Sequence, residues 1–99
     1  MEKLVRDRIP SIMQASGLQP LVRYVSSAER LNWLQAKLYE EAGELERAPS
    51  LDECADVFEV LRAIAEVLGF SMEDVALAAD LKRDARGAFH DGCILTVQE

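Results

Sequence analysis

Residues 37–60 read KLYEEAGELERAPSLDECADVFEV, and this stretch decides the fold. Proline breaks a helix interior, so Pro49 predicts that one helix ends and another begins around a turn at 48–50. Acidic residues stand three positions apart on either side of this turn, Glu41 with Glu44 and Glu53 with Asp56. Residues at that spacing share a helix face. The stretch therefore predicts two consecutive helices, each with an acidic pair on one face.

Two of these acids, Glu41 and Glu53, occupy positions where helical periodicity calls for an apolar, core-facing residue. A buried carboxylate is costly and is normally neutralised, paired or bound to a metal. Residues 40–59 contain eight acids and one base, so a divalent cation is the economical partner. Carboxylate oxygens favour Mg²⁺, Mn²⁺ or Ca²⁺ over Zn²⁺.

Structural explanations compete with a metal site. Acid-rich helix faces are commonly solvated, and Lys37 stands four residues before Glu41, where it can pair with it. Ser50 is a natural N-cap with Glu53 three residues on, as in a capping box. The box accounts for Glu53 but leaves Asp56 and the acids of the preceding helix unexplained.

Length and composition predict a single domain spanning residues 1–99. The net charge of −7 argues against a nucleic-acid polymer or an anionic membrane as partner. The charged start MEKLVRDRIP and the lack of any run of about 18 apolar residues predict a cytoplasmic protein without a membrane span. Cys54 and Cys93 are far apart and fit a reducing compartment.

We expect an all-α fold with three long helices and minor additions. Serine caps, glycine stops and apolar periodicity place the long helices at about 28–48, 51–68 and 72–86. A short N-terminal helix and a two-stranded ribbon, pairing 21–25 with 93–97, complete the expectation. Because a lone hairpin is marginal and three helices make a thin core, we expect a homodimer or a dimer of dimers to complete a helical bundle.

Basic residues gather near both ends of the chain. Lys3 and Arg6 lie in the first segment, where they form either a solvated terminus or an arm that folds over an anionic ligand. Lys82 and Arg86 stand four apart at the end of the third long helix, where cations suit the helix dipole or hold phosphate oxygens.

Several metal-dependent and phosphate-binding architectures are excluded. The sequence has no GxxxxGK[ST] loop and no calcium loop of the EF-hand type. The one histidine, His90, falls outside the helices, so a di-iron site built on Glu-x-x-His motifs is also excluded. Acid-held metal beside Lys and Arg leaves hydrolysis of a phosphate-bearing substrate as the chemistry that fits.

The acidic motifs EEAGE at 40–44 and ECAD at 53–56 resemble the EExxE…ExxD signature of the MazG-type all-α nucleoside triphosphate pyrophosphohydrolases. The start KLVRDRIP at 3–10 is similar to that of the short phosphoribosyl-ATP pyrophosphohydrolase-like branch. Residues 82–89, KRDARGAF, resemble its terminal K-x-x-RGGF pattern, with Ala88 in place of glycine. The gap between the two acidic motifs is short for the family.

The resemblance implies Mg²⁺-dependent hydrolysis, with Mn²⁺ as the alternative ion, of a nucleoside triphosphate to the monophosphate and pyrophosphate. The implied substrates include non-standard nucleotides. It assigns metal binding to Glu41, Glu44, Glu53 and Asp56, and phosphate contacts to Lys3, Arg6, Lys82 and Arg86. Glu41 also counts as catalytic, together with Glu40, which is either a further metal ligand or the residue that positions the attacking water. A helical interaction module without catalysis, or a nucleotide sensor on the same fold, is the alternative.

Overall fold

The computed structural model describes residues 1–97, and every regular element in that range is a helix. The elements are α1 (Ile9–Ala15), α2 (Ser27–Arg47), α3 (Leu51–Val67) and α4 (Met72–Arg86). The three long helices begin and end within one residue of their predicted bounds. The all-α prediction is confirmed.

Local chemistry explains these boundaries. The Ser26 and Ser50 hydroxyls accept hydrogen bonds from the backbone N–H groups of Glu29 and Glu53 and so cap α2 and α3. Ser71 caps α4 through a full capping box with Asp74. At the end of α3, Gly69 adopts a φ of 85°, which suits glycine because it has no Cβ.

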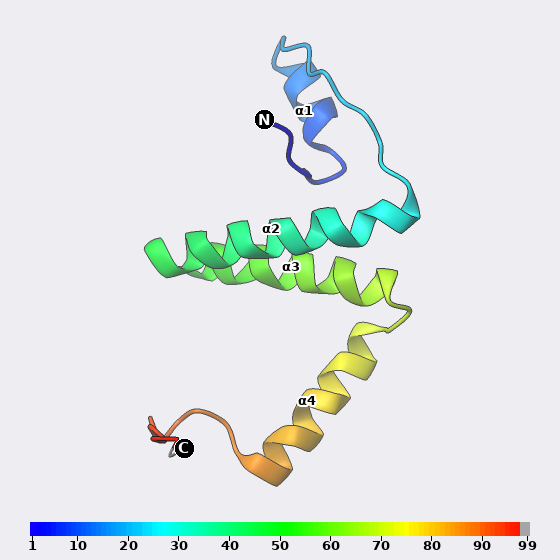
Figure 1. Ribbon diagram of the computed structural model, residues 1–99. Helices are drawn as coiled ribbons and strands as arrows, with labels where there is room; N and C mark the ends of the chain where they lie inside the picture. The colour runs from blue at the N-terminus through cyan, green and yellow to red at the C-terminus, as the bar shows by residue number, and fades with distance from the viewer. Residues whose placement is uncertain (98–99) are drawn as a thin grey trace.

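The α3–α4 turn is a Schellman motif. The N–H of Phe70 donates to the Ala65 carbonyl at 2.8 Å, and the N–H of Gly69 donates to the Glu66 carbonyl at 3.1 Å. These bonds satisfy carbonyls that the end of a helix would otherwise leave without partners. The glycine stop predicted at the end of the helix over about 51–68 is therefore confirmed at Gly69. Helix α4 leaves the α2–α3 pair in a new direction (Figure 1).

The centre of the molecule is an antiparallel hairpin of α2 and α3 (Figure 1). Its interior holds the buried hydrophobic side chains Leu34, Val60 and Ala65. Helix α4 packs little against α3 and projects away from the hairpin. The Cα radius of gyration is 17.5 Å, whereas a compact chain of this length has about 13 Å. One chain by itself is thus an open structure with a small core.

The predicted ribbon was wrong. Residues 21–25 and 93–97 form no strand in the structure. The first segment belongs to the connection between α1 and α2, and the second lies beyond α4 at the opposite end of the molecule (Figure 1). Because α4 carries the C-terminal segment away from the hairpin, the two segments never meet. The bundle was predicted for an oligomer and stays a prediction, since the structure contains one chain.

No described helix has the character of a membrane span. Over residues 1–97, none combines the length and the apolar character needed to cross a bilayer.

Candidate metal centre

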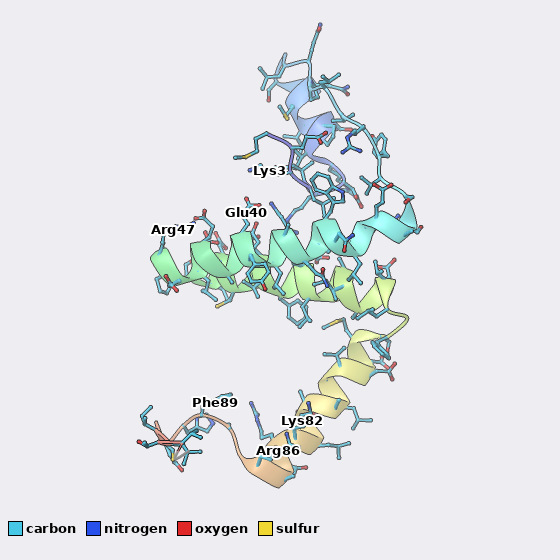
Figure 2. All side chains as sticks on the ribbon, viewed as in Figure 1. Lys3, Glu40, Arg47, Lys82, Arg86 and Phe89 are labelled. Atoms are coloured by element: carbon cyan, nitrogen blue, oxygen red, sulfur yellow. The ribbon has the colours of Figure 1, made fainter. Side chains whose placement is uncertain are left out.

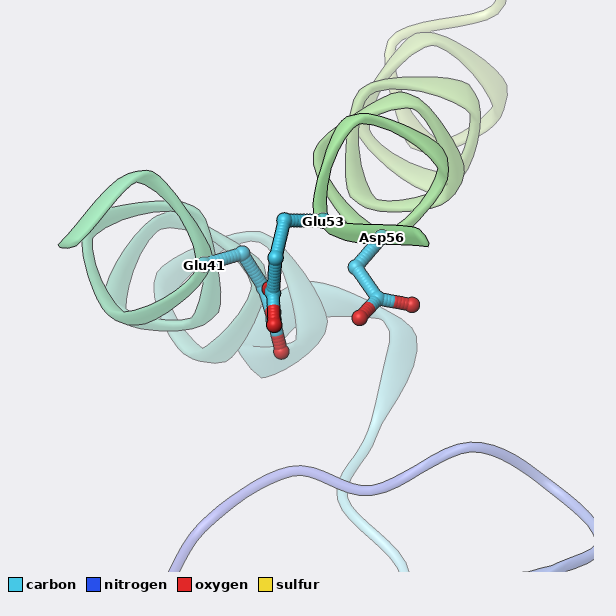
Figure 3. A group of neighbouring side chains, drawn as sticks. All are labelled: Glu41, Glu53 and Asp56. Atoms are coloured by element: carbon cyan, nitrogen blue, oxygen red, sulfur yellow. The ribbon is translucent and has the colours of Figure 1, made fainter. Parts of the chain in front are cut away.

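Three of the predicted ligands converge at the closed end of the α2–α3 hairpin. Glu41, Glu53 and Asp56 each place one carboxylate oxygen within 4.8 Å of the others. In Figure 3 the carboxylates of Glu41, from α2, and Glu53, from α3, lie close together, and Asp56 extends from α3 beside them. All three are half-buried. The acids converge because the short turn after Ala48 reverses the chain, so that α3 runs back along α2 and the acids of the two helices lie side by side.

Glu53 is the most unusual member of this centre. Its Oε2 atom is buried and has no hydrogen-bond partner in the part of the chain that is described. Burial raises the pKa of its carboxyl above the usual value, and the neighbouring acids, first Asp56 and then Glu44 and Glu41, raise this pKa further. The backbone of Glu53 joins the Ser50 cap, but its side chain is left for another partner.

Two basic groups already approach the centre. The Lys37 Nζ lies 3.3 Å from Glu41 Oε1 and 3.3 Å from Glu40 Oε2. The Arg6 Nη2 donates to Asp56 Oδ1 at 2.7 Å. The contact between Lys37 and Glu41 was expected from their spacing. The second contact, from Lys37 to Glu40, was not predicted, although residues three apart on a helix are also neighbours.

Neither of the other two predicted acids, Glu40 and Glu44, belongs to the group of three. Glu40 faces Lys37 and Lys3, whose Nζ lies 3.6 Å from Glu40 Oε1, and it is outside the three-acid group. Glu44 is exposed and pairs at 2.8 Å with Arg47, so the structure does not bring it into that group. Lys3 and Arg6 lie beside the centre, which is the position that the second of the two alternatives, an arm, requires.

Lys82 and Arg86 are not brought to the acids within one chain. Both lie near the end of α4, far from the labelled Lys3 and Glu40 (Figure 2). The projection of α4 away from the hairpin separates them.

A groove of about 1020 Å³ lies between the hairpin and the segment that precedes it. Its walls include residues 1–10 and 20–25 on one side and parts of α2 and α3 on the other, and it reaches Glu41 and Asp56. Arg23 bridges the two sides. It pairs with Glu2 at 2.7 Å, and its guanidinium lies 5.6 Å from the centre of the Trp33 ring. The sequence around Trp33 did not predict its contact with Arg23.

Comparison with known proteins adds one partial relative. The chain matches no protein-family model, and no solved structure matches it. It is 48% identical over 52 residues to an uncharacterized protein of Mycolicibacterium smegmatis, a match that covers 52% of this chain and 53% of that protein. The chain thus spans about half the length of the curated relative it matches.

Proposed function

We propose that this protein is a Mg²⁺-dependent nucleotide pyrophosphohydrolase, which hydrolyses a nucleoside triphosphate to the monophosphate and pyrophosphate. The convergence of Glu41, Glu53 and Asp56 carries the proposal. The resemblance of both acidic motifs and both basic ends to the MazG-type enzymes supports the reaction and extends it to non-standard nucleotides.

The residues at the centre fit a divalent cation. They offer carboxylate oxygens only, which suits Mg²⁺ or Mn²⁺. Glu53 supplies a buried oxygen that lacks a partner among residues 1–97, and proteins rarely leave such a group unsatisfied. A cation bound here would neutralise phosphate oxygens and lower the pKa of water.

The surrounding residues have distinct roles in the proposed reaction. Glu41, Glu53 and Asp56 would hold the ion, while Lys3 and Arg6 would bind phosphate oxygens. Water would attack phosphorus, the bridging P–O bond between the α- and β-phosphates would break, and the monophosphate and pyrophosphate would separate, while a carboxylate accepts the proton of the water. Glu40 suits this role, because Lys37 holds it next to the centre and apart from the three ligands.

The proposal includes a homo-oligomer, a homodimer or dimer of dimers, whose bundle is completed by a second copy. Large apolar side chains of α4 and of the segment after it are exposed, among them Leu77, Leu81, Phe89 and Ile94. Leu77 and Leu81 stand four residues apart and share a face of α4, and an exposed apolar face supports an interface there. A second copy would also offer the basic end of its α4, with Lys82 and Arg86, as a further source of phosphate contacts.

The proposed location is the cytoplasm. Cys54 and Cys93 are both unpaired and exposed, which is the state expected of thiols in a reducing compartment.

Release of pyrophosphate from a panel of standard and modified nucleoside triphosphates, measured with Mg²⁺ and with Mn²⁺, tests the activity. Glu41→Gln and Asp56→Asn should each lower the rate by at least about tenfold, because even groups one shell away from a metal change activity by 10–100-fold. Glu46→Gln, an exposed acid on α2, is the matched control. Full activity of both site variants would refute the proposal, and nucleotide binding without turnover would instead indicate a sensor.

Sedimentation equilibrium tests the oligomer. Leu81 is 60% exposed in the single chain, and Leu81→Glu would place a charge in an apolar interface. The wild-type protein should sediment as a dimer or tetramer and the variant as a smaller species. A monomeric wild type would refute this part of the proposal.

A further inference from the structure

The segment before α1 is tied to the rest of the chain by three ion pairs, two of which reach the α2–α3 hairpin. We call residues 1–8 the N-terminal arm. Its Glu2 pairs with Arg23, its Lys3 with Glu40, and its Arg6 with Asp56. The last of these contacts reaches a proposed metal ligand directly, at 2.7 Å.

The two cations at the centre are held in different ways. Lys37 shares a helix with Glu41, and its side chain is 16% exposed. Arg6 comes from the arm, 50 positions away from Asp56 in the sequence, and its side chain is 55% exposed. Ion pairs exposed to this degree contribute about 0–1 kcal/mol. Arg6 is therefore the cation that leaves Asp56 at little cost, while Lys37 stays in place.

Charge balance favours such a departure when a divalent ion enters. Three carboxylates with Lys37 and Arg6 carry a formal charge of −1. A divalent ion together with both bases would make it +1, whereas a divalent ion that replaces Arg6 makes it zero. Like charges at close range disfavour the arrangement that keeps all three cations.

We propose that Arg6 is an exchangeable counter-ion of Asp56: a divalent cation takes its place on the carboxylate, and the released guanidinium binds the anionic ligand. The inference rests on the proposed metal centre and adds a control on its loading. The arm covers the ligands when no cation is bound, and it becomes a phosphate-binding element once one is. Arginine suits the second role because its fork of N–H groups matches phosphate oxygens.

A different role for Arg6 predicts the opposite result. If Arg6 remained on one oxygen of Asp56 and oriented the other toward the ion, its removal would weaken metal binding, as loss of an orienting partner does. If Arg6 exchanges with the ion, its removal eliminates a competitor and strengthens metal binding. The sign of the change in affinity separates the two roles.

Calorimetric titration with Mn²⁺ measures this sign in the full chain. Arg6→Gln should bind Mn²⁺ more tightly than the wild type by up to about fivefold, the equivalent of an exposed ion pair. Arg8→Gln, an exposed arginine of the same arm, makes the same change in charge and should leave the affinity unaltered. With Mg²⁺ at saturation, Arg6→Gln should also bind inorganic pyrophosphate about tenfold more weakly, because it lacks a charged hydrogen-bond donor.

The fluorescence of Trp33 gives a second measurement. Trp33 is the single tryptophan of the chain, and it lines a cavity together with arm residues 1–4. Mg²⁺ should change its emission in the wild type and in Arg8→Gln, and change it less in Arg6→Gln, where the contact between the arm and Asp56 is already absent.

The outcomes distinguish a failure of the exchange from a failure of the metal centre. Equal or weaker Mn²⁺ binding by Arg6→Gln, beside normal binding by the wild type, would overturn the exchange and leave the metal centre standing. Absence of Mn²⁺ binding in the wild type and in Arg8→Gln would overturn the metal centre and the exchange together.

Discussion

The replacement of Glu53 by glutamine gives the sharpest test of the acidic centre. The substitution keeps the size and helix position of the side chain and removes one of three converging carboxylates. In the cation-free protein at neutral pH, Glu53→Gln should raise the melting temperature, because a buried carboxylate without a partner among the described residues is replaced by a neutral amide. With Mg²⁺ present, the order should reverse.

The size of the reversal follows from mass action. An ion that binds only the folded state at 100 times its dissociation constant stabilises that state by about 2.7 kcal/mol. A domain of about this size gains roughly 4–8 °C in melting temperature per kcal/mol, so the wild type should gain roughly 10–20 °C. Glu53→Gln should lose most of this gain, because two carboxylates bind the ion far more weakly than three.

Differential scanning calorimetry with and without Mg²⁺ measures both effects, at one protein concentration so that any assembly equilibrium is held constant. Glu46→Gln serves as the control, since it removes an exposed acid of α2 and should melt and respond as the wild type does. An equal rise with Mg²⁺ in the wild type and in Glu53→Gln would refute the reasoning, as would a wild type that does not respond.

Three further perturbations test the pH response, the core and a helix cap. The pKa of Glu53 in the folded chain lies above its usual value of 4.5, so between these two pKa values the folded chain keeps a proton that the unfolded chain releases. The denaturant midpoint of the cation-free protein should therefore fall as pH rises through this window. The midpoint of Glu53→Gln should lack this part of the pH dependence. Leu34→Ala should cost about 2–5 kcal/mol in urea unfolding, because Leu34 is 5% exposed in a small core, whereas the exposed Gln35→Ala should change stability by less than about 0.5 kcal/mol. Ser71→Ala should cost about 1 kcal/mol by removing the capping box of α4, and unchanged helicity and stability would contradict that role.

The parts of the fold that were predictable depend on local chemistry. Helix ends follow from Ser50, Ser71 and Gly69, whose effects act within one turn. The convergence of Glu41 with Glu53 was predictable as well, because a short turn leaves the second helix little choice but to return along the first.

The parts that were missed depend on contacts between distant segments. The ribbon prediction was wrong because its two segments meet only if α4 returns to the hairpin, and no short-range sequence pattern indicates the direction of α4. The contact of Arg6 with Asp56 spans 50 positions, and only the fold of the arm reveals it. Glu44 lies three residues after Glu41 and was expected on the same helix face, yet its carboxylate pairs with Arg47, three residues further on.

The small interior of the single chain has a practical consequence. In one chain the hydrophobic interior rests on Leu34, Val60 and Ala65. In the proposed oligomer, association would therefore supply much of the stability, and folding and assembly would become one concentration-dependent event. The proposed activity per chain should then fall on dilution without any inhibitor, so that the amount of protein made would itself set the output.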